Sequence, residues 1–279
     1  MHQLGSAGCV RLVLSATNRG NNMRRLSLLS FGLVVLAVTT TGLLALAQSS
    51  SEKLPVDVEL VIAADGSGSI SDAELAVQRE GYAAAITDPQ ILNVIRSGIH
   101  GRIAVAYLEW GGADSQEIIA DWQLIENVDQ AEAFARVIRQ TPRKAFGWNS
   151  ISNAIAAATA MIESNDYDGF RKVIDVSGDS GQYGGMPLPI ARQRALNAGI
   201  TINGLTLNYR GGGLSGPGGM PLTLHYERDI IGGPGAFVKS VEVPEAFHDA
   251  ILEKLLLEIA ATPHDNPNIQ HAQAKPLLD

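Results

Sequence analysis

The sequence predicts an α/β fold: a doubly wound, mostly parallel sheet with helices on both faces and one antiparallel edge strand. Short apolar segments rich in valine and isoleucine alternate with longer segments of helical character along most of the chain. Only one pair of strand-like segments follows without a helix between its members, which fits an antiparallel pair. Loops of aspartate, serine and glycine follow two strands, at the sheet edge where ligands bind in such folds.

Six segments are predicted as strands from their apolar and β-branched composition. The first is a nearly continuous apolar run, typical of a strand buried on both faces. The second and third flank a turn that begins at Gly111, and they form the antiparallel pair. The fourth and fifth are central strands, and the sixth is the last. The predicted strands span residues 56–63, 102–110, 115–125, 171–177, 200–207 and 236–241.

Seven segments are predicted as helices. Ser71 and Glu74 have the spacing of a capping box and start the first helix. The alanine-rich fourth helix follows a loop over 141–148, Gly199 ends the fifth as a C-cap, and Pro244 lies in the first turn of the last. The predicted helices span residues 71–87, 90–97, 129–140, 150–164, 187–198, 222–231 and 244–261.

Residues 23–47 have the form of a secretory signal peptide. Arg24 and Arg25 precede a long uncharged apolar run, which ends in a small-residue cleavage pattern at Ala47. The apolar run is longer than usual, so an uncleaved membrane anchor is the alternative interpretation. We therefore expect a periplasmic or secreted protein cleaved after Ala47, and a membrane contact only if this segment stays uncleaved.

The rest of the chain divides into three parts. Residues 1–22 fit no part of a signal, and we interpret them as an over-extended start before Met23. Residues 54–262 are predicted to form one domain, since this length is sufficient for one well-buried core. The polar, proline-containing tail over 263–279 is predicted to be disordered.

Composition excludes several classes of function. Residues 48–279 carry 17 basic and 29 acidic side chains, a net charge of −12, and such a surface repels the phosphates of nucleic acids. The only cysteine is Cys9, so the exported part has neither disulfides nor a thiol nucleophile. The spacing of the six histidines does not suggest a paired metal site.

The loop after the first strand contains Asp65, Ser67 and Ser69, separated by glycines. One carboxylate and two hydroxyls are hard oxygen donors, and few charges with retained waters suit Mg²⁺. The glycines let the backbone bend so that the side chains converge. The alternative is a plain turn, because aspartate, glycine and serine are common loop residues that need no metal.

This pattern resembles the von Willebrand factor type A domain, a doubly wound α/β sandwich with a metal-ion-dependent adhesion site. The Asp65-x-Ser67-x-Ser69 loop matches the first metal motif of that family. The family's second loop supplies a threonine, whose position falls on Asn149 here, and its third loop supplies an aspartate that Asp179 matches. The resemblance implies Mg²⁺ or Mn²⁺ bound directly by Ser67 and Ser69, with Asp65 and Asp179 acting mainly through waters.

The resemblance extends over residues 55–260. Segments 171–179 and 198–205 are similar to a bacterial family of exported proteins known as domain of unknown function 1194. Asn149 departs from the threonine of the wider family. Its amide oxygen is a neutral donor, but it sits on a longer side chain, so either Asn149 ligates the ion or the adjacent Ser150 replaces it.

Three further residues have open roles. Trp110 and Trp148 lie where strand-side loops end, so both are expected near the ligand-binding edge of the sheet. There they contribute to a binding surface if they are exposed, or they pack internally, as tryptophan usually does. Asp175 lies in the middle of a strand. It points toward the first-strand loop or, as its apolar neighbours favour, forms a buried bond to a loop backbone.

The predicted function is an exported, non-enzymatic binding module that uses the metal to capture an acidic group of a protein partner. A metal-free scaffold with a degenerate site is the first alternative, and a metal-assisted hydrolase is the second. The hydrolase lacks a recognisable nucleophile and base near the loops. The oligomeric state stays open.

Overall fold

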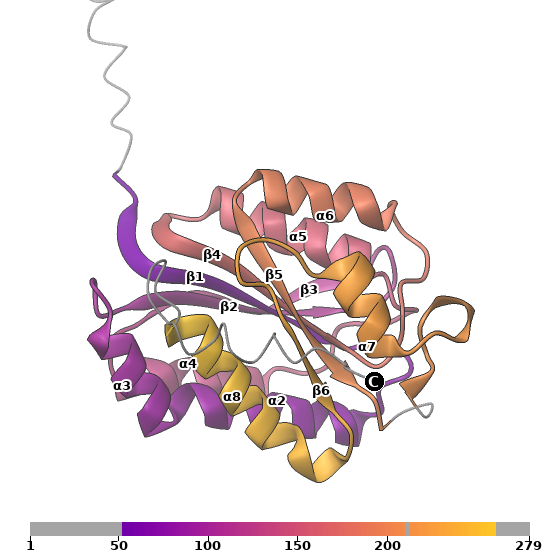
Figure 1. Ribbon diagram of the computed structural model, residues 1–279. Coiled ribbons are helices and arrows are strands. Elements are labelled where there is room, and N and C mark those ends of the chain that lie inside the picture. The colour runs from indigo at the N-terminus through magenta and orange to yellow at the C-terminus, as the bar shows by residue number, and fades with distance from the viewer. Residues whose placement is uncertain (1–51, 210–212, 261–279) are drawn as a thin grey trace, which may run out of the picture. The chain divides into compact units, whose positions relative to one another are not determined.

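Within residues 52–209 and 213–260, which the computed structural model describes, six strands form one sheet in the order β3-β2-β1-β4-β5-β6 (Figure 1). Every neighbouring pair is parallel except β2 and β3. The predicted fold class, with its antiparallel edge strand, is confirmed. The strands are β1 (Leu54–Asp65), β2 (Ile103–Trp110), β3 (Gln116–Ile125), β4 (Tyr167–Gly178), β5 (Ile200–Leu207) and β6 (Val238–Val241).

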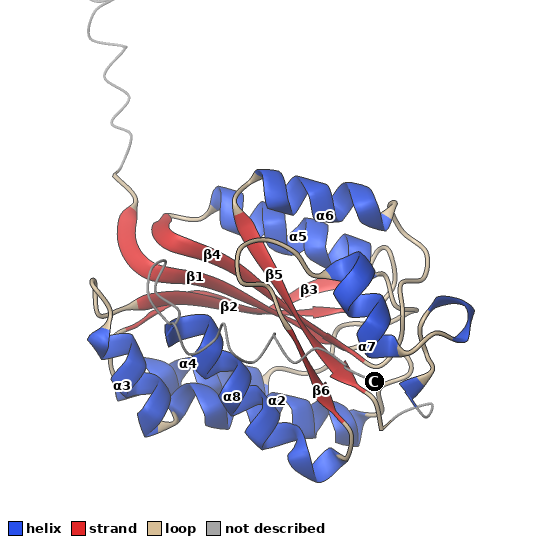
Figure 2. Ribbon diagram, in the orientation of Figure 1, coloured by secondary structure: helices blue, strands red, loops and turns tan. Residues whose placement is uncertain are grey.

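Helices cover both faces of this sheet, so that the described part has three layers (Figure 2). Helices α2, α3, α4 and α8 pack on one face, and α5, α6 and α7 pack on the other. The helices are α2 (Asp72–Thr87), α3 (Pro89–Ser97), α4 (Val128–Gln140), α5 (Ile151–Ser164), α6 (Leu188–Asn197), α7 (Leu222–His225) and α8 (Phe247–Ala260).

Alternation along β1 builds both cores. Leu60 and Ile62 belong to the core on the α2 side, whereas Val61 and Ala63 belong to the core on the α5 side. All four side chains are fully buried. Burial of each larger aliphatic side chain contributes about 1.5–3 kcal/mol to stability. A strand that is buried on both faces is therefore most stable when nearly all its residues are apolar, as the sequence of β1 indicated.

Strand β4 begins four residues earlier than the sequence indicated, at Tyr167. Its polar first residues pair with the start of β1, where Leu54 lies opposite Tyr167. The buried Glu59 carboxylate accepts hydrogen bonds from the Gly169 N–H at 2.8 Å and from Asn165 Nδ2 at 2.6 Å. This long-range contact, which composition does not reveal, holds the extension.

Two predicted helices are less regular than expected. Residues 222–231 form the single turn of α7 followed by a π-helical turn, Tyr226–Ile230. Residues 244–261 begin with a 3₁₀ turn, Pro244–Ala246, before α8. A 3₁₀ turn is frequent at a helix end, where the backbone hydrogen bonds are incomplete, whereas a π-helical turn is rare. Ser71 does cap α2 as predicted, with the reciprocal Glu74 bond of a capping box.

A buried charged cluster joins α8 to the sheet. Lys254 Nζ lies 2.7 Å from Asp175 Oδ1 and also pairs with Glu258, and all three side chains are at most 1% exposed. Tyr82 Oη donates to Asp175 at 3.4 Å, and Asn203 Nδ2 donates to Glu258 at 2.9 Å. Asp175 is therefore buried, as its apolar neighbours indicated. Its charged partner is Lys254 on α8, and not the loop backbone or the first-strand loop that the sequence suggested.

In the described part of the chain, no helix is both long and apolar enough to cross a membrane. The predicted over-extended start (1–22), the signal peptide (23–47) and the tail (263–279) lie outside the described residues. Their assignments stay predictions.

Candidate functional site

The candidate site lies at the carboxyl edge of the sheet, above β1 and β4. The chain leaves β1 toward one face through the Asp65 loop and leaves β4 toward the other through the Asp179 loop. Strand β1 lies between β2 and β4, so this is the switch point at which doubly wound sheets open a crevice for ligands. The loop between α4 and α5 brings Asn149 to the same edge.

Four of the five predicted ligands form one hydrogen-bonded group. The hydroxyl oxygens of Ser67 and Ser69 lie 3.0 Å apart, and Ser69 Oγ donates to Asp179 Oδ1 at 3.0 Å. Asp65 Oδ1 accepts the Ser67 N–H at 2.8 Å. The Asp179 N–H points at Asp65 Oδ2 over a longer 3.4 Å. Residues 110 or more positions apart in the sequence thus present their oxygens together.

Burial governs the electrostatics of this group. Asp65 is fully buried, and desolvation, followed by repulsion from Asp179, raises the pKa of Asp65 to about 7. Hydrogen bonds from Ser67 and the Asp179 backbone oppose that rise. Two carboxylates held close in a buried place need a proton or a cation between them.

Asn149 is the fifth predicted ligand. Its side chain is 5% exposed, and its Oδ1 is buried without a hydrogen-bond partner in the described part of the protein. Its backbone carbonyl accepts the Tyr183 N–H at 2.7 Å, which fixes the loop. Among the described residues, Asn149 Oδ1 therefore makes no hydrogen bond to the other four candidate ligands. An orphaned buried acceptor normally signals a missing donor or ion.

Ser150 is oriented differently. Its hydroxyl lies 3.4 Å from Ser152 Oγ and packs against the backbone of Gly185, where even a Cβ would overlap it. Its N–H donates to the Gly111 carbonyl at 2.7 Å. These contacts direct Ser150 toward the start of α5, so Asn149 is the more available of the two alternatives.

The donor set fits a hard divalent cation. It comprises two carboxylates, two hydroxyls and one amide oxygen, which are the ligand types that magnesium and manganese prefer. Within the described residues no cluster of three or more His, Cys, Asp or Glu side chains is placed to hold a metal. The site is thus unlike the cysteine and histidine sites of zinc proteins.

Arg143 fastens the loops together, and the sequence analysis missed it. Its guanidinium donates to the carbonyls of Gly66 at 2.9 Å, Ser67 at 2.6 Å and Ile70 at 2.8 Å. The Gly68 N–H in turn donates to the Gly147 carbonyl at 2.8 Å. One basic residue in a loop carries no sequence signal for this role, because its partners are backbone atoms far away in the sequence.

Tyr226 lies beneath the carboxylates and was also missed. It is fully buried, and its hydroxyl has no hydrogen-bond partner within the described residues. A Cβ on Gly178 would come within 2.7 Å of that hydroxyl and 3.3 Å of Asp65 Oδ2, so the three groups are close neighbours. Burial, together with the charges of Asp65 and Asp179, raises the pKa of Tyr226 well above its ordinary value.

The two tryptophans differ. Trp110 is fully buried and donates its Nε1–H to the Ala63 carbonyl at 3.0 Å, so of its two alternatives it takes the internal packing that is usual for tryptophan. Its ring is part of the core on the α5 side of the sheet. Trp148 is 70% exposed and Tyr183 is 69% exposed, and both line a cavity that also reaches Asn149.

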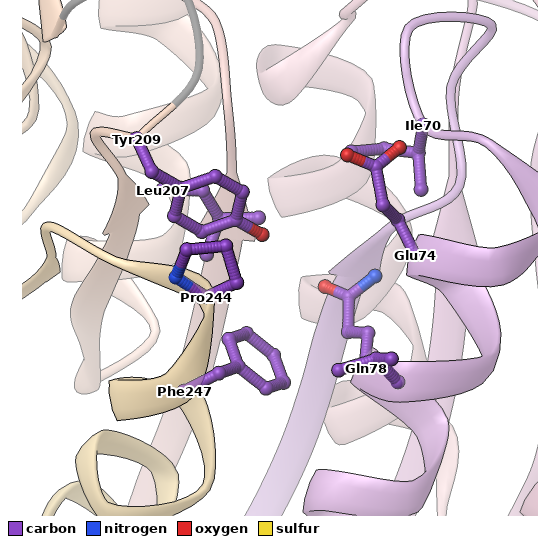
Figure 3. A pocket seen from close by; sticks show the side chains of 8 residues that line it. Ile70, Glu74, Gln78, Leu207, Tyr209, Pro244 and Phe247 are labelled. Carbon is purple, nitrogen blue, oxygen red and sulfur yellow. The ribbon is translucent and has the colours of Figure 1, made fainter.

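A second cavity lies between α2, the end of β5 and the start of α8 (Figure 3). Its volume is about 80 Å³, room for two or three water molecules. Ile70, Leu207 and Phe247 are among its apolar lining residues, with Glu74 and Tyr209 at its side. Ligand sites are usually several hundred cubic ångströms, so this cavity is too small to be the main one.

Solved structures with a similar fold include a pilus adhesin, a von Willebrand factor type A protein and a thread matrix protein. The pilus adhesin SpaC from Lactobacillus rhamnosus GG matches with a TM-score of 0.54 and 12% identity, over 75% of this chain and 31% of that one. A von Willebrand factor type A protein from Catenulispora acidiphila matches with a TM-score of 0.51 and 13% identity, over 74% and 43%. Proximal thread matrix protein 1 from the mussel byssus matches with a TM-score of 0.51 and 12% identity, over 75% and 49%.

This chain thus spans 31% to 49% of the length of those proteins, and identities this low establish the fold alone. No curated protein is significantly similar to the sequence. A family model described as a protein of unknown function, DUF1194, matches residues 55–263. The chain therefore belongs to the DUF1194 family, and the described part of it has the fold of von Willebrand factor type A domains.

Proposed function

We propose that this protein is an exported binding module that holds Mg²⁺ or Mn²⁺ and uses it to capture a carboxylate of a protein partner. The proposed ligands are Asp65, Ser67, Ser69, Asn149 and Asp179. The observation that carries the proposal is the convergence of two hydroxyls and two carboxylates from separate loops, beside an unpaired amide oxygen. The likeness to adhesion and matrix proteins supports a binding role.

The chemistry of the ligand set explains why a carboxylate would bind. The serine hydroxyls and the Asn149 amide are neutral, so direct coordination by them would leave most of the ion's charge uncompensated. An acidic side chain would then be attracted to the ion. Without the cation, the negative charge of the protein would repel an acidic partner, so binding would depend on the metal.

A non-enzymatic role is supported by the hydrogen bonds of His225, which lies close to Gly181 in the loop after Asp179. His225 Nδ1 pairs with Asp229 at 2.8 Å, but its Nε2 accepts the Gln182 N–H at 3.3 Å. The nitrogen that would activate a nucleophile is therefore already engaged by backbone.

An exported location, periplasmic or secreted, is proposed from the signal-like segment. Sequencing of the mature amino terminus tests cleavage after Ala47.

Calorimetric titration with Mg²⁺ and Mn²⁺ tests the metal site. We expect saturable binding in the wild type and its loss in Asp65→Asn, which keeps the size of the side chain and removes its charge. Asp168→Asn is the matched control, because Asp168 is an exposed carboxylate near the opposite end of β4. Asn149→Thr reports whether a hydroxyl in this position binds more tightly than the amide.

Three results would contradict the proposal. Absence of metal binding in the wild type would favour the metal-free scaffold. Turnover of a phosphoester or ester that Asp65→Asn abolishes would favour the hydrolase. Binding of an acidic partner that persists in the presence of a chelator would mean that the partner binds without the metal.

A further inference from the structure

We propose that Trp148 and Tyr183 form the second half of the partner site and bind an aromatic side chain that adjoins the captured acidic residue. This inference rests on the proposed function and adds the sequence preference of the partner. Trp148 immediately precedes Asn149, and Tyr183 follows Asp179 by four residues. Both rings are thus carried by the loops that supply candidate metal ligands.

The two rings together line two cavities. Trp148 and Tyr183 line a space of about 290 Å³, and both also line a space of about 300 Å³ that includes Asn149 and Ser180. Their exposed fractions, 70% and 69%, are high for large aromatic side chains. Covering both rings removes apolar surface from water, so an apolar occupant gains free energy on each side.

In the lining of the cavity that includes Asn149, the side chains of Ser180, Ser215 and Gln182 are already engaged, and Asn149 is itself a proposed metal ligand. Ser180 Oγ donates to Asp179 Oδ1 at 3.0 Å, and Ser215 Oγ donates to the Asp179 carbonyl at 2.7 Å. The Gln182 amide bonds to Ser152 and to the Gly184 carbonyl. A sugar ring needs free hydrogen-bonding groups around its hydroxyls, whereas an aromatic side chain does not. The inventory therefore favours the aromatic residue.

The charge of the cavity points the same way. Its lining contains no lysine, arginine, aspartate or glutamate among the described residues. An occupant with its own charge would find no counterion there, so the charge of the partner belongs at the metal and the neutral ring belongs in the cavity. The acidic residue of the partner would therefore bind at the metal, and its aromatic neighbour would bind in the cavity.

The walls of the cavity are held in place before any partner arrives. The Tyr183 N–H donates to the Asn149 carbonyl at 2.7 Å, and the Gly181 N–H donates to the Ser215 carbonyl at 3.0 Å. The backbone that carries Tyr183 is therefore tied to the loop that carries Trp148. A preformed site loses less entropy when it binds, and its preference for one side chain is correspondingly sharper.

The test uses two blocked peptides, acetyl-Gly-Asp-Phe-Gly-amide and acetyl-Gly-Asp-Ala-Gly-amide, titrated calorimetrically into the full exported protein with MgCl₂ and with EDTA. We expect the phenylalanine peptide to bind roughly threefold to tenfold more tightly in Mg²⁺, as aromatic pairs usually provide. Trp148→Ala and Tyr183→Ala should each reduce that ratio, and the double variant should abolish it. Phe170→Ala is the control, because Phe170 is a 58% exposed aromatic residue at the start of β4.

The outcomes separate the two proposals. Metal-dependent binding with equal affinity for both peptides overturns the aromatic site and leaves the proposed function standing. A preference that survives EDTA and Asp65→Asn supports the aromatic site and contradicts capture by the metal. Binding of neither peptide in either buffer overturns both. Metal affinity is measured for each variant, so a lost ion is not mistaken for a lost ring contact.

Discussion

At the scale of single residues, the candidate site contains polar atoms whose partners are missing from the protein itself. Asn149 Oδ1 and the Tyr226 hydroxyl are both buried without a hydrogen-bond partner among the described residues. Each such atom costs about 1–3 kcal/mol relative to a paired one. The Tyr226 hydroxyl is a close neighbour of Asp65 Oδ2, and Asn149 is one of the proposed metal ligands.

Tyr226→Phe tests this cost. Because the hydroxyl is unpaired, its removal should leave the free energy of unfolding unchanged or raise it by about 1 kcal/mol in metal-free protein. Tyr82→Phe is the matched control, since the Tyr82 hydroxyl donates to buried Asp175 and its removal should destabilise by about 1 kcal/mol. Urea denaturation in EDTA measures both. Equal losses in the two variants would mean that the Tyr226 hydroxyl has a partner.

At the scale of elements, close backbone approaches hold the loops. A Cβ on Gly111 would overlap the carbonyl oxygen of Phe146, which also accepts the Gly112 N–H at 2.7 Å. The loop after β2 therefore touches the loop that carries Asn149 without an intervening side chain. Only glycine allows this contact, because any other residue must push the backbones apart.

Gly111→Ala should consequently destabilise the protein by roughly 3 kcal/mol or more and weaken metal binding, since the displaced segment leads to Asn149. Gly112→Ala is the control in the adjacent position, where a Cβ would meet its nearest atoms at 3.4–3.5 Å, and it should cost less than about 1 kcal/mol. Denaturation and metal titration of both variants decide. Similar behaviour of the two would show that the loops can separate without loss.

Helix α8 is attached to the sheet through charge as well as apolar packing. Burial, aided by repulsion from Asp175 and opposed by Lys254, raises the pKa of Glu258 to about 7. Burial also raises the pKa of Asp175. The folded state therefore holds protons that the unfolded chain releases near pH 4.5, the ordinary glutamate value.

The sign of the pH dependence follows. A raised carboxyl pKa contributes stability that is fully present below about pH 4.5 and is lost as the pH rises through about 7. Glu258→Gln should gain stability relative to wild type by on the order of 2–3 kcal/mol between pH 4.5 and pH 8. Denaturation at both pH values measures it, with the exposed Glu253→Gln on the same helix as the control. Parallel curves for wild type and Glu258→Gln would contradict the assignment.

At the scale of the whole molecule, metal binding should appear as thermal stability. A ligand at one hundred times its dissociation constant stabilises the folded state by about 2.7 kcal/mol. For a domain of this size, that corresponds to a rise of roughly 5–10 °C in the melting temperature. Calorimetric scans with Mg²⁺ and with EDTA should differ by this amount in wild type and should coincide in Asp65→Asn. A shift that survives Asp65→Asn would indicate binding elsewhere.

The fold was predictable from the sequence because its strands and helices are marked locally. The apolar run of β1 and the Ser71 cap of α2 both reflect interactions within a few residues. The Asp65 loop was predictable for the same reason, whereas Asp179 needed the family resemblance. Their hydrogen-bonded grouping is a property of the structure, since the two residues lie 114 positions apart.

The missed features all depend on distant partners. Lys254 looks like an ordinary solvated lysine of a helix until the sheet places Asp175 against it. Arg143 binds carbonyl oxygens, which every residue has, so its role leaves no trace in composition. The sequence left the packed and exposed alternatives for Trp110 open for a similar reason, because its burial is decided by the core around it.

The hold of Arg143 on the first loop has a kinetic consequence. Because its guanidinium ties the backbone around Ser67 to the loop that leads to Asn149, the two loops should fluctuate together and need little rearrangement to receive an ion. The rate of capture would then be limited by how fast the cation sheds its own water shell. Mg²⁺ dehydrates reluctantly, so it would enter slowly even where it binds tightly. Rapid-mixing measurements of metal binding should therefore give a rate set by dehydration of the ion and not by rearrangement of the protein.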